Sequence, residues 1–351
     1  MPLVSVCIPT CNRPSYLKRT LQCVRNQKFT DYEVIIINDG GCDISSIVKG
    51  QNDARIRIIV NDKRMGPSFA RNTAIANAQG KYITYMDDDD VYYEDHLHTL
   101  VTYMREHEFV YSECTDVLED ENGVVLKKEN RFYPPYHPSL IKRCNFIPIG
   151  GIMHRKDLIE KTGGFDCNIS FGEDWELWIR CSRILPFHHI KKVTWEYRKR
   201  DSNHNRNNIH DAKINTRSIN EIIWKKHSLI PNIRALYPDS VPDWAVEKLS
   251  AMLGDEKIFV YGAGTFFKQV YPSIKNNILG IFDANHAKLD RHFRDRYNLG
   301  VLPPEKLNLV NKSRILSTAV GNVRDVLITI YTFQGRVDNI IFLDDFLDQP
   351  N

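Results

Sequence analysis

The sequence GKYITYMDDDD, at residues 80–90, joins a strand-sized apolar pattern to four consecutive aspartates. Four adjacent carboxylates repel one another, and they destabilise a fold unless a cation or hydrogen-bond donors compensate their charge. At a strand end, Mg²⁺ or Mn²⁺ can supply this compensation, because these ions take oxygen ligands from one or two carboxylates and from phosphate groups. The alternative interpretation is a solvated acidic turn, which the preceding strand pattern makes less favourable.

The residues before this stretch alternate between strand and helix patterns. This order predicts a parallel sheet with crossover helices, and ligands bind such sheets beyond the carboxyl ends of the strands. We therefore expect Thr10, Asn12, Asp39 and the aspartates at 87–90 to converge on one crevice. The expected strands are 4–8, 33–38, 55–60 and 81–86. The expected helices begin at Pro14 and at Gly66-Pro67, and Gly80 is expected at the C′ position of the second helix. Residues 110–112 and 123–126 are expected to form a hairpin.

The pair Glu173-Asp174 forms a second acidic motif, in the first turn of a helix expected over residues 171–180. One of these carboxylates can act as a general base that takes a proton from an attacking hydroxyl. The alternative is that both charges complement the helix dipole. The neighbouring Trp175 and Trp178 can stack on sugar rings, although their i, i+3 spacing is equally typical of core residues.

Asp39 and Arg71 are two further candidates for ligand binding. Asp39 ends the second expected strand, where its carboxylate can accept hydrogen bonds from a base or a ribose. Its alternative role is that of a turn residue before Gly40-Gly41. Arg71 lies near the start of its helix, where it can bind a phosphate with two N–H groups or form a surface salt bridge.

A second α/β pattern begins near Glu256, with strands expected at 258–261 and 278–282. The sequence YGAGTFF, at residues 261–267, begins like a dinucleotide-binding motif, and Asp283 follows at about the usual distance. The third glycine position, however, is Phe267, whose bulk hinders close helix–strand packing and the approach of a phosphate. We therefore expect a structural or partner-binding domain rather than a working NAD site.

The composition bounds the class of protein. A length of 351 residues favours two domains, and 42% hydrophobic with 26% charged residues excludes disordered and collagen-like chains. The net charge of +3 gives no sign of a nucleic-acid binder. This average hides residues 191–226, where ten Lys or Arg stand against four Asp or Glu. The segment predicts attraction to a diphosphate, an anionic acceptor or a lipid headgroup surface, or else a solvated helical face.

Neither a signal-peptide pattern nor a membrane-spanning pattern is found in the sequence. The eight cysteines lie between Cys7 and Cys181, with no CxxC pair and no Cys/His spacing typical of metal sites. We therefore expect a reduced, cytoplasmic protein. Association with the inner face of the membrane stays open, as does the oligomeric state.

Taken in order, these elements resemble the family 2 glycosyltransferases of the GT-A fold, over about residues 1–215. The resemblance implies an α/β nucleotide-diphospho-sugar transferase fold at 1–215, a helical connector at 216–255 and a smaller Rossmann-like accessory domain at 256–351. Residues 4–13 resemble the opening strand and nucleotide loop of that family, 33–40 its second strand with a base-binding Asp, 66–72 and 80–90 the run that leads to its DxD motif, and 172–178 its ED motif.

The resemblance also implies roles for individual residues. Asp174, with Glu173 beside it, would be the general base, and Asp89 would bind the Mn²⁺ or Mg²⁺ ion that bridges the diphosphate. His154 would contact the diphosphate or the metal, or else be structural, and Tyr197-Arg198 with His204 would close a loop over the site. The division of roles among the four aspartates stays open. The nucleotide would be held by Pro9, Thr10, Asn12, Arg13, Asp39, Arg71, Asp87 and Asp88, and the donor–acceptor region would be lined by Trp175 and Trp178.

The activity that the resemblance implies is metal-dependent transfer of a sugar, with inversion, from a nucleotide-diphosphate donor that we expect to be UDP-linked. The acceptor would be a glycan or a lipid-linked saccharide, and no nucleic acid is expected as a partner. Two alternatives belong to other classes. One is a nucleotide-dependent oxidoreductase that uses the C-terminal α/β unit, and the other is a non-catalytic scaffold that binds sugar nucleotides.

Overall fold

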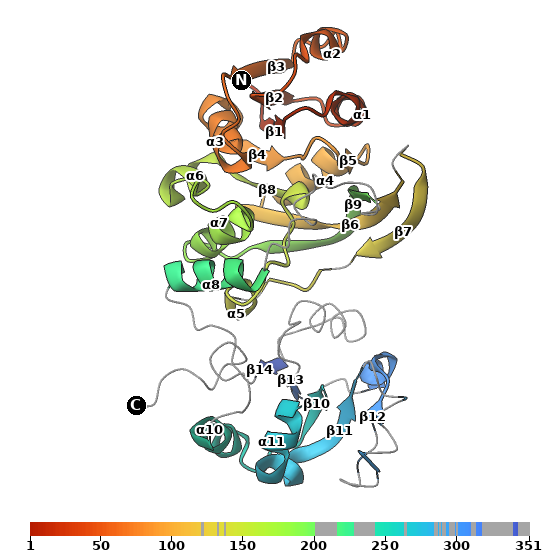
Figure 1. Cartoon of the computed structure of the whole chain (residues 1–351), viewed down its shortest axis with the longest axis vertical. Helices are drawn as coiled ribbons and strands as arrows, with labels where there is room; N and C mark the ends of the chain where they lie inside the picture. The colour runs from red at the N-terminus through yellow and green to blue at the C-terminus, as the bar shows by residue number, and fades with distance from the viewer. Residues whose placement is uncertain are drawn as a thin grey trace. The chain divides into compact units, whose positions relative to one another are not determined.

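The computed structural model describes residues 1–200, 216–227, 243–309, 314–317 and 340–342, apart from 121–122, 132, 137, 263–264 and most of 284–300. The chain divides into two compact units (Figure 1). Unit 1 comprises Met1–Ile141 with Asn145–Ile219, and unit 2 comprises Lys142–Cys144 with Asn220–Asn351. The expected domain boundaries stay a prediction, because much of the stretch between 201 and 242 lies outside the described residues.

The sheet of unit 1 contains both parallel and antiparallel strand pairs. Its strands are β1 (Val4–Thr10), β2 (Tyr32–Asp39), β3 (Ile56–Asn61), β4 (Tyr82–Tyr85), β5 (Val91–Tyr92), β6 (Phe109–Glu119), β7 (Val125–Arg131), β8 (Ile152–Arg155) and β9 (His188–Arg200). They follow the order β3-β2-β1-β4-β8-β6-β9-β5, with β7 paired to β6. The first four strands pair in parallel, as predicted, and β8 is antiparallel to both β4 and β6. A hairpin of β6 and β7 is present in the expected region, but β7 pairs with residues 114–119, while residues 110–112 pair with β8 and β9.

Helices cover both faces of the parallel part of this sheet. For this reason β2 is buried at every position, as expected for a parallel strand between two helical layers. In Figure 1, α3, α6 and α7 lie on one side of the sheet and α1 lies on the other. The helices of unit 1 are α1 (Pro14–Arg25), α2 (Ser45–Lys49), α3 (Pro67–Asn77), α4 (His96–Tyr103), α5 (Pro138–Ile141), α6 (Lys156–Thr162) and α7 (Glu173–Ser182), with a 3₁₀ turn at Ile149–Gly151 and with α8 (Thr216–His227) at the unit boundary.

Gly80 differs from the prediction that it caps α3. The helix ends at Asn77, and its C-cap residue Ala78 is extended. Gly80 instead lies against β1, where an added Cβ atom would stand 2.6 Å from the backbone nitrogen of Ser5. The residue is therefore small because the chain entering β4 passes close to β1, and not because a helix ends there.

Unit 2 contains a separate, wholly parallel sheet with the strand order β12-β11-β10-β13-β14. Phe267 is fully buried in the core of this unit, with Tyr271 and Phe293 5.5 and 5.4 Å away between ring centroids. Within the described ranges, no helix combines the length and apolar character that crossing a membrane requires. The elements of unit 2 are α10 (Asp243–Leu253), β10 (Ile258–Tyr261), α11 (Thr265–Ile274), β11 (Ile278–Phe282), β12 (Val301–Leu302), β13 (Arg314–Ser317) and β14 (Ile340–Phe342), with 3₁₀ turns at Lys275–Asn277 and Pro304–Leu309.

Candidate active site

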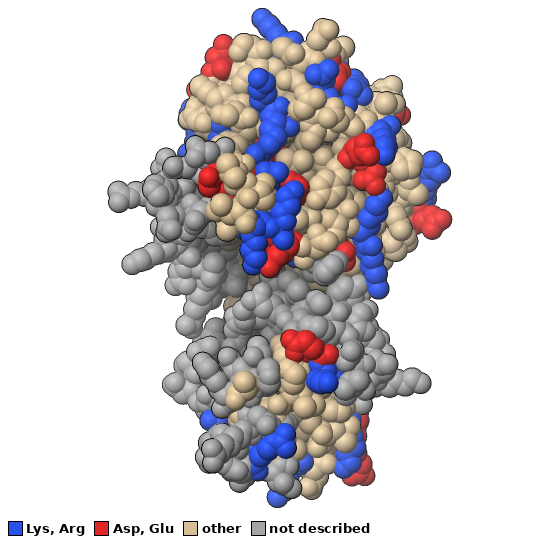
Figure 2. All heavy atoms as spheres, turned by 90° about the vertical axis from the view of Figure 1, so that its right-hand side faces the viewer, with Lys and Arg blue, Asp and Glu red and all other residues tan. Residues whose placement is uncertain are grey.

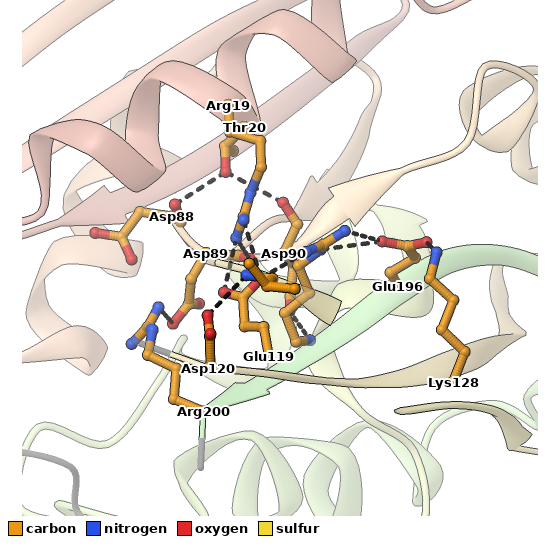
Figure 3. A network of polar contacts seen from close by, with 12 residues as sticks. Arg19, Thr20, Asp88, Asp89, Asp90, Glu119, Asp120, Lys128, Glu196 and Arg200 are labelled. Carbon is orange, nitrogen blue, oxygen red and sulfur yellow. Dashed lines mark hydrogen bonds and ion pairs between the residues drawn. The ribbon is translucent and has the colours of Figure 1, made fainter. Parts of the chain in front are cut away.

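The four aspartates form a turn at the carboxyl end of β4, and helix α1 holds the backbone of this turn. The Thr20 hydroxyl donates to the carbonyl oxygens of Asp88 and Asp90, at 2.9 and 3.1 Å. The Arg19 guanidinium donates to the carbonyl of Asp89 at 3.0 Å (Figure 3). The acidic turn, residues 87–90, is therefore fixed by hydrogen bonds from within the protein before any ligand is considered.

Asp88 follows β4 and lies beside the carboxyl end of the neighbouring strand β1, as the sheet topology predicts. The Thr10 hydroxyl donates to one carboxylate oxygen at 2.6 Å, and Arg13 contacts the other at 3.1 Å. The side chain is buried, and its burial raises the pKa of the Asp88 carboxyl to about 6, with the nearby charge of Asp89 adding to the shift. Of the residues predicted to converge, Thr10 and Asp88 are thus in contact, and Arg13 joins them.

Asp89 lies between two arginines. One carboxylate oxygen is 3.0 Å from Arg13 and 3.0 Å from Arg200, the last residue of β9. The Arg200 guanidinium also stacks over the ring of Tyr16, 3.8 Å from its centroid, and its side chain is only 6% exposed. Burial raises the pKa of Asp89, and the two arginines offset this rise only in part.

Asp90 points away from these two carboxylates and toward β9. One of its oxygens accepts a hydrogen bond from the backbone N–H of Arg198 at 3.0 Å. The Arg198 side chain binds Glu119 and Glu196, both labelled in Figure 3, each at 2.6 Å. Burial, with Asp89 nearby, raises the pKa of Asp90 well above its usual range. Asp90 thus anchors the turn to the sheet.

Asp87 connects the acidic turn to the second acidic motif through Arg71. The Arg71 guanidinium lies 2.7 Å from Asp87 and 2.6 Å from Glu173. Its side chain is 5% exposed, and the charges of the two carboxylates hold its pKa above the usual value despite burial. Residues separated by about a hundred positions in the sequence therefore share one ion-pair cluster.

Asp174, in the first turn of α7, is held by an amide that sequence reasoning did not identify. The Asn145 side-chain N–H₂ donates to both carboxylate oxygens, at 3.0 and 3.1 Å. The backbone N–H of Trp175 donates to Oδ1 at 2.7 Å. Burial raises the pKa of Asp174 to about 6, and the charge of Glu173 adds to this rise, while the hydrogen bonds and Arg71 oppose it. A carboxylate with such a pKa can accept a proton near neutral pH.

Asp39 and Asn12 stabilise the loops at the ends of β1 and β2. The Asp39 carboxylate accepts hydrogen bonds from the backbone N–H groups of Met65 and Gly66, the latter at 2.7 Å. Gly66 has φ +95°, a conformation that favours glycine, so Asp39 fixes the turn that starts α3 and thereby places Arg71. Asn12 accepts a hydrogen bond from the backbone N–H of Cys42 at 2.8 Å, and Pro9 precedes it in β1.

His154, Trp175 and Trp178 lie in the core. His154 is fully buried, its Nε2 is 3.0 Å from the hydroxyl of Tyr85, and its Nδ1 is 2.9 Å from the carbonyl of Arg155. Both ring nitrogens therefore have protein partners. The indole N–H groups of both tryptophans donate to backbone carbonyls, and their side chains are at most 2% exposed. Their positions match the structural alternative that the sequence left open.

Four Lys and Arg residues of β9 are paired with carboxylates of unit 1. Lys192 pairs with Asp95, Lys199 with Asp116, and Arg198 and Arg200 with the partners given above. Figure 2 likewise shows Lys and Arg interspersed with Asp and Glu on the face of unit 1. Residues 201–215 of the predicted basic segment, which include His204, lie outside the described residues.

The acidic turn fits a divalent cation. Asp88 and Asp89 offer carboxylate oxygens, the ligands that Mg²⁺ and Mn²⁺ prefer, and burial raises the pKa of both groups even with Arg13 and Arg200 present. Among the residues that the structure describes, no group of three or more His, Cys, Asp or Glu side chains is arranged to hold a metal alone. An ion would therefore take its other ligands from water and phosphate, as Mg²⁺ and Mn²⁺ do.

Comparisons with known proteins agree with the fold. The family model described as glycosyl transferase family 2 matches residues 5–162. An uncharacterised glycosyltransferase of Methanocaldococcus jannaschii is 32% identical over 210 residues, which cover 56% of this chain and 71% of that protein. Another, from Rickettsia bellii, is 34% identical over 204 residues, which cover 57% of this chain and 29% of that protein. The chain thus spans less than a third of the length of this relative.

A solved structure shows the same architecture. S. aureus TarS 1–349, in complex with UDP-GlcNAc, aligns with a TM-score of 0.51 and 17% identity over 64% of this chain and 66% of that chain. At this identity the likeness concerns the fold, which is the GT-A fold of a curled mixed sheet. On the family match, the identity to the Methanocaldococcus relative and this fold, the chain belongs to glycosyltransferase family 2.

Proposed function

We propose that this protein transfers a sugar from a nucleotide-diphosphate donor to a hydroxyl of a glycan or lipid-linked saccharide, with inversion at the anomeric carbon. The observation that carries the proposal is the ion-pair cluster in which Arg71 joins Asp87 of the acidic turn to Glu173, the neighbour of Asp174. The acidic turn, which would hold the donor diphosphate through a metal ion, would therefore form one site with Asp174, a carboxylate that can accept a proton.

Asp174 is the general base of the proposed reaction. Its carboxylate would take the proton from the acceptor hydroxyl as that oxygen attacks the anomeric carbon, while the nucleoside diphosphate leaves from the opposite face. Asn145 keeps both carboxylate oxygens in a fixed orientation, which favours a productive approach of the hydroxyl. Because its pKa is about 6, Asp174 is mostly ionised at neutral pH and is still a useful base.

The donor would bind at the carboxyl ends of β1, β2 and β4. The nucleotide side of this region would be formed by Pro9, Thr10, Asn12 and Asp39, and Asp88 would contact a ribose hydroxyl. Arg13 and Arg200, which flank Asp89, would neutralise the diphosphate.

Asp89 would hold Mn²⁺ or Mg²⁺ together with oxygens of the diphosphate. The bound ion would stabilise negative charge on the departing nucleoside diphosphate. We do not include His154 among the ligands, because both of its ring nitrogens already have partners inside the core. Asp87 contributes through its contact with Arg71.

We choose UDP as the donor nucleotide because TarS, a protein of the same fold, binds UDP-GlcNAc. No specific observation favours the oxidoreductase alternative. In unit 2, Phe267 fills the position of the third glycine and is fully buried in the core. The Rossmann-like character of this unit stays a prediction, and so does membrane association.

A thermal-shift panel tests donor binding. The wild-type chain and Asp89→Asn are scanned with UDP-, GDP- and TDP-sugars and with NAD⁺, each with Mn²⁺ or with chelator. A specific donor raises the apparent Tm of the wild type only when Mn²⁺ is present, because ligands that bind the native state stabilise it. A shift with NAD⁺ and none with any sugar nucleotide would favour the oxidoreductase. No shift with any of these ligands would count against both functions.

A further inference from the structure

Arg71 is placed between two acidic motifs and not at an open ligand surface. Its two terminal nitrogens lie 2.7 Å from Asp87 and 2.6 Å from Glu173. Its side chain is 5% exposed, and its guanidinium packs 5.6 Å from the ring centroid of Phe165. Both terminal nitrogens of this guanidinium are therefore paired with carboxylates, and its Nε is buried. The geometry therefore argues against direct phosphate binding, the role that the sequence suggested.

The two partners of Arg71 belong to different parts of the site. Asp87 begins the acidic turn after β4, and Glu173 is the first residue of α7. Glu173 is only 12% exposed, and its carboxylate lies 2.6 Å from the Arg71 guanidinium. Asp174 follows Glu173 directly in the same helical turn and feels the charges of both Glu173 and Arg71.

We propose that Arg71 is a positioning residue that couples the acidic turn to the general base. It holds the first turn of α7 at the acidic turn, and it neutralises Glu173 so that Asp174 stays ionised beside it. This inference rests on the proposed function. It assigns to Arg71 an action through Asp174, in place of contact with the donor.

The charges of Glu173 and Arg71 should shift the pKa of Asp174 in opposite directions, which gives a test. Two charged groups act on Asp174, namely Glu173 from its own helix and Arg71 from α3. Loss of the negative charge in Glu173→Gln favours the ionised form of Asp174 and lowers its pKa. Loss of the positive charge in Arg71→Met leaves Glu173 unpaired and raises that pKa. In the double variant both charges are absent, so the two effects oppose each other.

The experiment compares wild type, E173Q, R71M, the double variant R71M/E173Q and a control, R57M. Arg57 forms an ion pair with Glu33 near the amino ends of β2 and β3, remote from the acidic turn. The pKa of Asp174 is measured by ¹³C NMR of protein labelled at aspartate carboxyl carbons, and D174N assigns the signal. In parallel, kcat and donor KM are measured against pH with Mn²⁺ present.

We expect the Asp174 pKa, and with it the acidic limb of kcat, to fall by about one unit in E173Q and to rise by about one unit in R71M. The double variant should lie between the two single variants, R57M should remain close to wild type, and donor KM should change less than about threefold. If R71M does not fold, E173Q and the double variant still give the sign of the Asp174 pKa shift that each charge causes.

Three results would overturn the coupling. They are an unmoved Asp174 pKa in E173Q, a double variant that shifts as far as R71M, or a large rise in donor KM with an unchanged pH profile. The last result would make Arg71 a donor-binding residue. If the wild type transferred no sugar, the proposed function would fail, while the NMR titration would still decide the electrostatic coupling separately.

Discussion

The contact between Asn145 and Asp174 illustrates how a single side chain prepares a base. An amide that donates to both oxygens fixes the carboxylate plane, and it also stabilises the charged form, which opposes the effect of burial. Buried carboxylates without such donors have a much higher pKa. Asn145 therefore sets both the direction and the pH range of the proposed proton transfer.

Replacing Asn145 with Ala should lower activity in a pH-dependent way. Without the amide, the pKa of Asp174 rises further above 6, because the hydrogen bonds that favour its ionised form are lost. We expect kcat at pH 7 to fall about tenfold and the acidic limb of the profile to move to higher pH, as for loss of one charge-assisted hydrogen bond of about 1.5–3 kcal/mol. Steady-state rates between pH 5 and 9 measure this. Asn168→Ala, which removes only a local contact with Asp166 on the surface, is the control. An N145A profile that matched wild type would remove Asn145 from the mechanism.

Asn145 could not be predicted from the sequence, and neither could Arg200. Nothing in the residues around position 145 marks that amide, because its partner lies 29 positions further along the chain. Arg200 does stand in a recognisable pattern, because Glu196, Arg198 and Arg200 alternate along a strand and so lie on one face. That pattern identifies a charged face, but the pairing with Asp89 depends on the sheet order.

At the scale of elements, the acidic turn is held from two sides. Helix α1 binds its carbonyl groups through Thr20 and Arg19, and β9 binds Asp90 through the backbone of Arg198. Carboxylates that repel one another would otherwise spread apart. These contacts keep Asp88 and Asp89 side by side in the turn.

Replacing Thr20 with Val should loosen this turn without changing its charge. The variant leaves two buried carbonyls without their hydroxyl donor, so we expect it to lose about 1–3 kcal/mol of stability and to raise donor KM. Urea unfolding and donor titration measure the two effects. Thr102→Val is the matched control, because its hydroxyl donates only to the carbonyl of His98 on an exposed helix face. A T20V variant with wild-type KM would show that the turn does not need α1.

The same scale shows which elements the sequence predicts well. The first four strands and the helices that begin at Pro14 and at Gly66-Pro67 follow from local apolar periodicity, and the structure confirms them within a few residues, whereas α2 was not predicted. Gly80 was misassigned because a helix-ending glycine and a glycine in close contact with another strand have the same local sequence. The parallel pairing of β6 with β9 links residues more than seventy positions apart, so no local pattern could indicate it.

At the scale of the whole molecule, the described site residues all belong to unit 1, and unit 2 has its own core. The sequence correctly indicated a second α/β unit. The bulky Phe267, which replaces the third glycine of the dinucleotide-binding pattern, is buried in the core of this unit. Local sequence does not reveal what this unit binds, because the residues that decide it are brought together by the fold.

Replacing Phe267 with Ala tests the role of that ring. Because the side chain is fully buried among Val270, Phe293 and their neighbours, we expect a loss of about 3–5 kcal/mol in the stability of unit 2, and no gain of NAD⁺ binding. Calorimetric unfolding and NAD⁺ titration measure these outcomes. Phe69→Ala, at a position that is 36% exposed, serves as the control. NAD⁺ binding by either the wild type or F267A would reopen the oxidoreductase alternative.

The most direct test of the central claim compares the wild type with Asp174→Asn in two assays. Calorimetry measures binding of the nucleoside diphosphate with Mn²⁺, and release of nucleoside diphosphate from the donor identified in the thermal-shift panel measures turnover. If Asp174 is the base, the variant binds the nucleotide within about threefold of wild type while its turnover falls at least about a hundredfold, the range of general-base catalysis. Turnover at the wild-type rate in D174N would contradict the account.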